Sequence, residues 1–463
     1  MGDRIRAVSP VDGEVYVERA LADDREIAAA LDRAERAQEK WRKVAVAERA
    51  AILSRAVDAF VARRDDIAKE LTWQMGRPIR YTPSEVNGFE ERARYMIAVA
   101  EQALADVQVG DKPDFTRFIR RVPLGVAFVM APWNYPYLTA VNGVVPALMA
   151  GNAVLLKHSA QTPLCAERMG EAFAAGGLPA GVFQHLHLSH DAAARIIDSG
   201  QVDFVSFTGS VPGGHSVQDA ASHRFLEVGL ELGGKDPAYV RPDADLDHAI
   251  ENLADGAFFN SGQSCCAIER IYVHRDVYDR FVGGLVEFAR GYRLDDPSDP
   301  ETTLGPLIRP AAADFVRAQI HEAVAAGAKA HLDPKAFARD AAGSAYMAPQ
   351  VLTGVDHSMR IMTEETFGPA VGVMPVGSDD EAIRLMNDSR YGLTAAIWTS
   401  DEAAAIRIGD QVETGTWFMN RCDYLDPALA WTGVKDSGRG CSLSRLQYEY
   451  LTRPKSFHLR TAL

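Results

Sequence analysis

Cysteine is scarce in this chain of 463 residues. Its five cysteines are too few and too scattered for a disulfide framework, which favours a reducing compartment. They are Cys165, Cys265, Cys266, Cys422 and Cys441. We interpret three of them, Cys165, Cys422 and Cys441, as small buried hydrophobic residues. The adjacent pair at 265 and 266 needs a different explanation.

Long apolar runs are lacking too. The best apolar stretch, Val122 to Trp133, is shorter than the about 20 residues that a membrane-spanning helix needs, and proline and glycine interrupt it. The first residues contain no apolar segment of the kind found in signal peptides, and Arg6 does not fit the myristoylation pattern. We therefore predict a cytoplasmic protein with no membrane partner.

Positive charge is in deficit. Lysine and arginine number 49 against 63 aspartates and glutamates, which gives a formal net charge of -14. Because nucleic acids and anionic membranes carry the same sign of charge, neither is a favoured partner. Apolar residues make up 47% and charged residues 24%, an ordinary globular composition. The length predicts two or more domains.

Hydrophobic periodicity predicts helix from Asp24 to Val44 and onward to about Ala105, then a strand-like stretch at 107–122. From Val126 strands and helices alternate, which implies parallel strands with crossover helices and an α/β fold. The expected elements are strand Val126–Met130, helix Leu138–Met149, strand Ala153–Lys157, helix Pro163–Ala175, strand Val182–Leu188, helix Asp191–Asp198 and strand Phe204–Phe207. Ligands then belong at the carboxyl ends of the strands. The alternation resumes after Glu231 and runs to about residue 440, and 456–460 is a candidate edge strand.

Two motifs suggest nucleophilic chemistry. Cys265 ends the sequence Phe-Phe-Asn-Ser-Gly-Gln-Ser-Cys, a small polar loop in which a thiol is poorly placed as core filler. Glu231 precedes Leu-Gly-Gly-Lys, where Gly233 and Gly234 allow the backbone to approach a ligand closely. A cysteine nucleophile with a carboxylate base is the chemistry that this pairing favours.

These motifs resemble those of the aldehyde dehydrogenase superfamily, whose base motif reads ELGGK and whose nucleophile motif reads FxNxGQxC. The resemblance covers essentially the whole chain. It implies a Rossmann-type cofactor domain at 1–106 and 124–230 and an α/β catalytic domain at 231–440. It also implies a small β oligomerisation element at 107–123 and 441–463, and hence a homodimer or a homotetramer.

The resemblance also implies the catalytic roles. Cys265 attacks the aldehyde to form a thiohemiacetal, and Cys266, the competing candidate, becomes a pocket neighbour. Glu231 activates water for thioester hydrolysis; members that transfer the acyl group to coenzyme A lack this residue, so a free acid is the expected product. Asn134, in a Pro-Trp-Asn turn, donates to the developing oxyanion.

NAD or NADP is the implied cofactor. The loop from Thr208 to Gly214 follows a predicted strand and opens a helix, but the GxGxxG fingerprint is missing. The residues expected to contact the cofactor are Trp133, Lys157, Ala160, Gly209, Ser210, Gly214, Glu365 and Phe367. At Ala160, members that prefer NAD usually carry an acidic side chain. Its absence leaves NADP permitted, and His158 or Ser159 are candidates to help accept its 2′-phosphate.

The expected substrate pocket is largely aromatic, which favours an uncharged aliphatic or aromatic aldehyde. Its residues are Tyr135, Leu138, Asn142, Cys266, Tyr424 and Trp431. Succinate-semialdehyde enzymes of the family place an arginine at the position of Asn142. Such a semialdehyde therefore remains an alternative, and it would need Arg421 to reach in.

Other readings compete with this one. A metal site at His185 and His187 has no further ligand at a suitable spacing, and a strand end with polar residues explains these histidines better. A catalytically silent binding protein on the same fold would not need Cys265, Glu231 and Asn134 together. A thiol hydrolase without cofactor would leave the nicotinamide motifs without a purpose.

Overall fold

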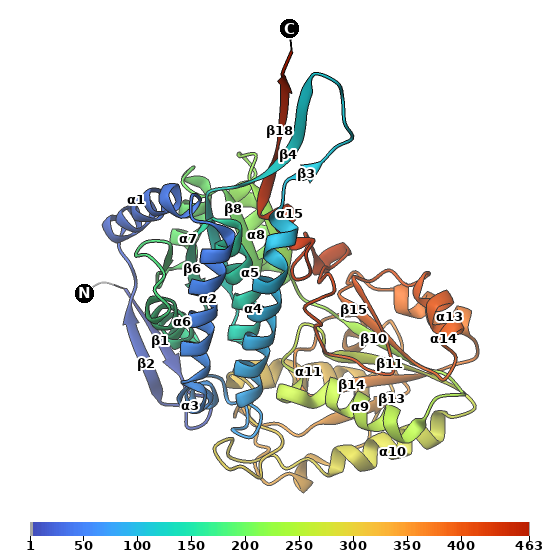
Figure 1. The fold of residues 1–463 in the computed structure, drawn as a ribbon. Coiled ribbons are helices and arrows are strands. Elements are labelled where there is room, and N and C mark those ends of the chain that lie inside the picture. The colour runs from blue at the N-terminus through green and yellow to red at the C-terminus, as the bar shows by residue number, and fades with distance from the viewer. Residues whose placement is uncertain (1–2, 463) are drawn as a thin grey trace.

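Two large β-sheets, each packed against helices, form the body of the protein (Figure 1). This computed structural model describes residues 3–462. Residues 1, 2 and 463, which the predicted terminal ranges include, lie outside the described residues. The α/β class is confirmed. None of the helices formed by residues 3–462 combines the length and the apolar character needed to cross a membrane.

The first sheet has six strands and carries a short antiparallel strand at one edge. Its order is β17-β9-β8-β5-β6-β7, and the last five strands run parallel. The strands are β5 (Val126–Ala131), β6 (Ala153–His158), β7 (Phe183–His185), β8 (Phe204–Thr208), β9 (Glu227–Glu231) and β17 (Gly438–Arg439). Every residue of β5 is buried, as expected for a central parallel strand covered on both faces.

Helices α1 to α8 accompany this sheet, and they include the crossover helices that the sequence predicted. They are α1 (Asp24–Trp41), α2 (Val46–Val61), α3 (Arg64–Met75), α4 (Pro83–Leu104), α5 (Pro136–Ala150), α6 (Pro163–Ala175), α7 (His190–Asp198) and α8 (Val211–Ala221). Helix α1 begins at a capping box between Asp23 and Glu26 and stops at Trp41, shorter than predicted. Strand β7 is likewise shorter than the predicted Val182–Leu188. Helix α4 packs along α5, an arrangement that matters for the site (Figure 1).

The second sheet has seven strands in the order β12-β13-β14-β11-β10-β15-β16, parallel except for β12. The strands are β10 (Asp236–Val240), β11 (Ile268–His274), β12 (Lys329–Ala330), β13 (Gln350–Thr353), β14 (Ala370–Val376), β15 (Thr394–Trp398) and β16 (Thr416–Met419). The accompanying helices are α9 (Leu246–Phe258), α10 (Tyr278–Arg290), α11 (Pro310–Ala325), α12 (Arg360–Thr363), α13 (Asp379–Asn387) and α14 (Glu402–Gly409), while the short α15 (Gln447–Tyr450) packs against α4 and α5. Three short 3-10 turns complete it: η1 (Phe259–Gly262), η2 (Pro334–Ala336) and η3 (Lys435–Ser437).

A three-stranded antiparallel sheet projects from the body (Figure 1). It consists of β3 (Val107–Gln108), β4 (Phe115–Pro123) and β18 (Thr452–Arg460), so the predicted edge strand at 456–460 is part of a longer strand. The rings of Phe118 and Phe457 stack across it with centroids 4.5 Å apart. A separate hairpin joins β1 (Arg4–Val8) and β2 (Val15–Ala20).

Candidate active site

A cavity of about 380 Å³ lies where the carboxyl ends of the first sheet face the loop after α9. It brings together all six residues expected for the pocket, and both motif residues reach it. The members of this set are Tyr135, Leu138, Asn142, Cys266, Tyr424 and Trp431, with Cys265 and Glu231. Arg421, by contrast, is exposed, and its guanidinium lies 4.0 Å from the Tyr424 ring centroid instead of lining the cavity.

The loop that carries Cys265 is held in a strained backbone conformation. Asn260 and Ser261 have φ of 52° and 57°, the left-handed region that non-glycine residues seldom adopt. The amide of Asn260 donates to the carbonyl of Gln263 at 3.1 Å, and the hydroxyl of Ser261 donates to the carbonyl of Gly305 at 2.8 Å. The side-chain oxygen of Gln263 accepts from the N–H of Ile308 at 2.7 Å. This loop is therefore pinned at three points just before the thiol.

The two neighbouring cysteines have different surroundings. Cys266 is buried, and its thiol donates to Oδ1 of Asp423 at 2.8 Å. The contact with Cys265, burial and the Asp423 charge together raise the pKa of Cys266 well above its usual value, so it keeps its proton. Cys265 is only partly buried and faces the cavity. Of the two thiols, Cys265 is the one that a substrate can reach.

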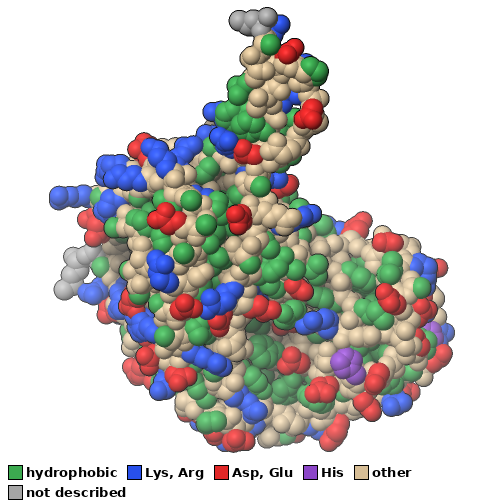
Figure 2. Space-filling model, viewed as in Figure 1, with side chains coloured by type: hydrophobic (Ala, Val, Ile, Leu, Met, Phe, Trp, Pro, Cys, Tyr) green, Lys and Arg blue, Asp and Glu red, His purple; other side chains and the backbone are tan. Residues whose placement is uncertain are grey.

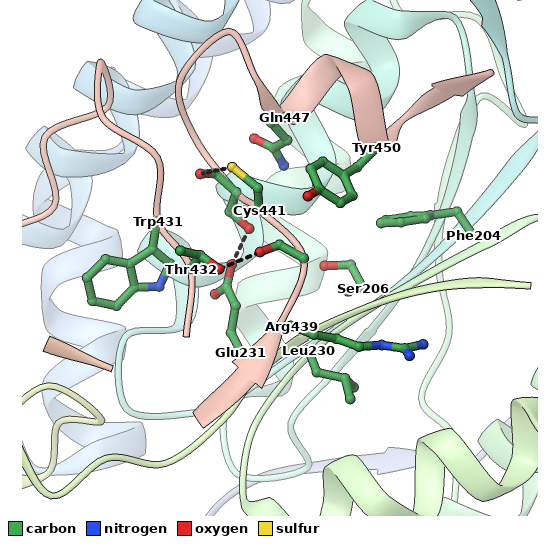
Figure 3. Close-up of a pocket in the computed structure, with 13 residues that line it drawn as sticks. Phe204, Ser206, Leu230, Glu231, Trp431, Thr432, Arg439, Cys441, Gln447 and Tyr450 are labelled. Carbon is green, nitrogen blue, oxygen red and sulfur yellow. Dashed lines mark hydrogen bonds between the residues drawn. The ribbon is translucent and has the colours of Figure 1, made fainter. Parts of the chain in front are cut away.

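Glu231 ends β9 and lines the cavity. Figure 3 shows it in a smaller neighbouring pocket, where it lies beneath the segment that carries Cys441, with Trp431 on one side. Its two carboxyl oxygens accept hydrogen bonds from different parts of the chain, one from the Thr208 hydroxyl at 3.1 Å and the other from the Ser442 hydroxyl. Burial raises the pKa of Glu231, and the two hydroxyl donors oppose that rise. A carboxyl group with a raised pKa is suited to take a proton near neutral pH.

The two glycines after Glu231 leave room for the opposite wall of the site. A Cβ at Gly233 would lie 2.5 Å from the Glu365 carboxylate, and one at Gly234 would lie 2.2 Å from the carbonyl oxygen of Cys265. A larger residue at Gly234 would have to move the backbone, and one at Gly233 would displace the Glu365 side chain. The Gly-Gly pair therefore lets the segment that follows Glu231 pack directly against the Cys265 loop.

Asn134 is buried beside the cysteine loop, and its amide donates to the carbonyl of Gln263 at 3.2 Å. The residue is held from behind by a fully buried ion pair. Arg77 contacts Glu85 at 2.6 Å and also donates to the Asn134 carbonyl and, at 3.1 Å, to Oδ1 of Asn260. One guanidinium thus ties the Pro-Trp-Asn turn to the cysteine loop.

Five of the predicted cofactor residues lie at or just after the carboxyl ends of β6 and β8. Lys157 lies in β6, its ammonium has no acceptor among the described residues, and burial lowers its pKa. Ser210 caps α8 by accepting from the N–H of Gly213 at 3.3 Å, so its hydroxyl oxygen is already engaged. Ala160 is exposed, and Gly209 and Gly214 flank the turn. The unpartnered Lys157 amine fits the hydroxyl groups of a ribose.

One expectation at this site is wrong. His158 was a candidate to help accept a 2′-phosphate, but its side chain is buried and its Nε2 lies 3.1 Å from the carbonyl of Pro136. Burial lowers the pKa of His158 to about 4, so it is neutral. The side chain turns into the core because the strand alternates, and the neighbouring Lys157 takes the open face. Ser159 accepts from the N–H of Gln161 at 3.2 Å.

The remaining cofactor candidates lie across the cleft. Glu365 accepts from the N–H of Gly234 at 3.0 Å, and burial raises its pKa to about 8. Phe367 packs edge-on against Trp133 with ring centroids 5.7 Å apart. Their loop is fixed by Glu269, which accepts from the N–H groups of residues 366 and 367 and pairs with the buried Lys235 at 2.6 Å.

Several residues at this site were not predicted from the sequence because they belong to no local motif. Asp423 lies in an irregular segment far from Cys266 in the chain, and burial raises its pKa to about 7. Ser442, Arg77 and Arg92 likewise reach the site only through the fold. For Arg92 the one available signal is an arginine on the apolar face of a helical segment, whereas Arg77 lies in the loop after α3. His187 pairs with Glu167 at 3.3 Å, and the described residues form no metal-binding cluster there.

Comparisons with known proteins match nearly the whole chain. The model of the Aldehyde dehydrogenase family matches residues 1–457. The chain is 37% identical over 445 residues to the succinate-semialdehyde dehydrogenase [NADP(+)] of Mycobacterium avium, covering 96% of this chain and 94% of that one. Two solved structures superpose closely. An aldehyde dehydrogenase from Brucella melitensis biovar abortus is 29% identical, with TM-score 0.95 over 100% of this chain and 95% of that one. An NAD-dependent aldehyde dehydrogenase from Sinorhizobium meliloti is 30% identical, with TM-score 0.94 over 100% and 92%.

Proposed function

The chain belongs to the aldehyde dehydrogenase family, and we propose that it oxidises its aldehyde to the free acid through Cys265, Glu231 and Asn134. It is an enzyme that uses NAD or NADP. The observation that carries the residue assignment is that Glu231, at the end of β9, and Cys265, in the loop between η1 and β11, line one cavity. Asn134 touches the same loop two residues before the thiol.

The first step is attack of the Cys265 thiolate on the aldehyde carbon, which forms a carbon–sulfur bond and turns the carbonyl oxygen into an oxyanion. The Asn134 amide has two N–H donors, and only one is used on Gln263, so the second can stabilise that oxygen. The strained and pinned loop holds the sulfur in place while the bond forms. A nicotinamide held beside Trp133 and Phe367 would supply the acceptor for the hydride that leaves the substrate carbon.

In the second step Glu231 acts on water. Oxidation leaves a thioester on Cys265, and Glu231 removes a proton from the water that attacks it, releasing the acid and the thiolate. Burial raises the pKa of Glu231, which makes it a better base, while Ser442 and Thr208 keep the ionised form accessible. A retained base of this kind favours hydrolysis over acyl transfer to a thiol acceptor.

We propose that the cofactor lies against Trp133, Lys157, Ala160 and the 209–214 turn, with Glu365 on the nicotinamide ribose. Support comes from the unpartnered Lys157 amine and from the fixed position of the Glu365 loop. The exposed Ala160 carries no charge that would repel a 2′-phosphate. The similarity to an NADP-named relative favours NADP without excluding NAD. In this proposal residues 1–106 and 124–230 form the cofactor domain and 231–440 the catalytic domain.

The proposed substrate is a short semialdehyde with a distal carboxylate. The relatives at 37% identity are named succinate-semialdehyde dehydrogenases, and the match spans nearly the whole chain. A second candidate, an uncharged aliphatic or aromatic aldehyde, has its own support. The cavity walls include Tyr135, Leu138 and Trp431, and position 142 is asparagine.

Homo-oligomerisation through the projecting sheet is also proposed. Apolar side chains gather along it (Figure 2), and Val107, Val109 and Leu459 are 39–48% exposed. Such a surface, formed by strands that extend beyond the body of one subunit, is typical of an interface. The predicted oligomer is a dimer or a tetramer. A cytosolic location, which the free thiols of all five cysteines favour, belongs to the same proposal.

The test is reduction of NAD and of NADP, followed by absorbance, for wild type, Cys265→Ala and Cys266→Ala. The substrates are succinate semialdehyde, pentanal and benzaldehyde. Turnover is expected to disappear in Cys265→Ala and to persist in Cys266→Ala. If Cys265→Ala were active and Cys266→Ala inactive, Cys266 would be the nucleophile and Cys265 its neighbour in the pocket. Equal activity in both would remove the thiol from the mechanism.

A further inference from the structure

Arg92 is a buried cation on the wall of the active-site cavity. It lies on α4, which packs along α5, and it is only 8% exposed. Its Nη1 donates to the carbonyl of Leu138 at 2.7 Å and lies 3.4 Å from Oδ1 of Asn142. Within residues 3–462, no carboxylate lies within 4.0 Å of this guanidinium, and its Nε and Nη2 have no acceptor.

This lack of a partner distinguishes Arg92 from two other buried cations near the site. Arg77 pairs with Glu85, and Lys235 pairs with Glu269. Removing a guanidinium from water without a directly paired anion is costly. Burial lowers the pKa of Arg92, and the more distant charges of Glu85, Glu231 and Glu91 oppose that shift only in part. An arginine nevertheless stays charged at any ordinary pH. The cavity therefore contains a desolvated positive charge with unused donors, which is the environment that an anionic ligand group completes.

The neighbour of Arg92 is also incompletely bonded. Asn142 is buried, lines the same cavity and has an amide nitrogen without an acceptor in the described part of the chain. The Asn142 amide nitrogen is itself buried, so the accessible N–H donors on this wall belong to the Arg92 guanidinium. A carboxylate, with two oxygens and about four acceptor positions, matches such a set in the way that a hydroxyl or an alkyl group cannot.

Four carboxyl groups also line the cavity: Glu91, Glu231, Asp255 and Asp423. Burial raises the pKa of Glu231 and Asp255, and it raises that of Asp423 to about 7, so these groups hold protons more readily than free side chains. Glu91 is exposed and accepts from the Tyr424 hydroxyl at 2.8 Å. Arg92 is then the permanent charge among the buried groups of the wall.

We propose that Arg92 determines specificity, by binding the distal carboxylate of a short ω-carboxy aldehyde while the carbonyl carbon lies at Cys265. This inference rests on the proposed semialdehyde function and names the group that recognises the substrate. It also explains how position 142 can be asparagine, since a guanidinium from the adjacent helix contacts that side chain.

The test compares Arg92→Met with wild type on succinate semialdehyde and on pentanal, an uncharged aldehyde of similar length. Loss of a buried hydrogen-bonded charge contact is expected to raise KM for the semialdehyde about 10- to 100-fold. Its kcat, and both constants for pentanal, should change little. Arg49→Met is the matched control: Arg49 is 5% exposed, donates to the carbonyl of Val44 and lies outside the cavity.

A relocation variant separates binding from packing. In the double variant Arg92→Ala, Asn142→Arg the guanidinium returns to the same wall from α5, and most of the semialdehyde affinity should return with it. Succinate, which carries the same end group, should raise the Tm of wild type and of the double variant but not of Arg92→Met. A purely structural Arg92 would give no rescue and equal KM changes for both aldehydes.

The outcomes also separate this inference from the proposed function. If wild type oxidises pentanal, or the cationic 4-aminobutanal, as efficiently as succinate semialdehyde, the proposed substrate is wrong whatever the variants do. If wild type prefers the semialdehyde and Arg92→Met keeps that preference, the substrate stands and the role of Arg92 is overturned.

Discussion

Ser442 donates a hydrogen bond to Oε1 of Glu231, although 211 residues separate the two in the chain. The contact exists because β17 brings the C-terminal segment back to pair with β9, with Gly438 opposite Glu231. Thr208 donates to the other carboxyl oxygen. The proposed base is therefore oriented by two hydroxyl groups that act on both of its oxygens.

This arrangement predicts the effect of Ser442→Ala on the pH profile. The hydroxyl stabilises the ionised carboxylate, so its loss raises the pKa of Glu231 and leaves less base available at pH 7. We expect kcat at pH 7 to fall by about tenfold, since a hydrogen bond to a charged group contributes roughly 1.5–3 kcal/mol. The acidic limb of kcat against pH should move to higher pH, with activity recovering toward pH 9.

The control for that experiment is Ser222→Ala, which removes a hydroxyl that bonds only its own helix end, at Asp219. Its profile should match that of wild type. A Ser442→Ala profile that drops equally at all pH values would mean that the serine supports the fold and does not tune Glu231.

A second prediction concerns Gly234. Its α-carbon faces the Cys265 carbonyl so closely that a Cβ would lie 2.2 Å away. Gly234→Ala must displace the nucleophile loop, and a displacement near 1 Å can cost about 100-fold in rate. We expect kcat to fall by about that factor while KM for the cofactor changes less. Gly283→Ala, where a Cβ meets nothing within 4 Å, is the control and should retain wild-type rates.

Cofactor choice supplies a third prediction. Ala160 is exposed two residues after the end of β6 and carries no charge. In Ala160→Glu a carboxylate would face the 2′-phosphate of NADP, and we expect KM for NADP to rise about tenfold or more while KM for NAD stays nearly constant. Ala160→Gln has the same size without the charge and should keep the wild-type ratio. Equal losses for both cofactors in Ala160→Glu would point to a steric effect.

The elements that follow local patterns were predictable, and the contacts between distant segments were not. Strand β5, helix α6 and the turn before α8 are set by short-range periodicity and capping, and the predicted bounds match closely. The motifs identified Cys265 and Glu231 because their glycines and polar neighbours are unusual for a core. Arg92 and Asp423 carry no such signal, since their importance comes from burial beside residues far away in the chain.

The carboxyl group of Asp423 gives the last prediction, on stability. Burial raises its pKa from 3.8 to about 7, so the folded protein binds this proton more tightly than the unfolded chain does. As pH rises from about 4 to about 7 the unfolded chain has already released the proton, and the folded state loses relative stability. Above pH 7 both states are ionised and the loss is constant.

Asp423→Asn keeps an acceptor for the Cys266 thiol and removes the charge. We expect its advantage in the free energy of unfolding to be small near pH 4, to grow up to pH 7 and then to level off at about 1–3 kcal/mol, with Tm following the same course. Thermal unfolding between pH 4 and pH 9 checks this, with the exposed Asp410→Asn as control. A Tm difference that does not vary with pH would mean that Asp423 is ionised throughout this range in the folded protein, which contradicts a raised pKa.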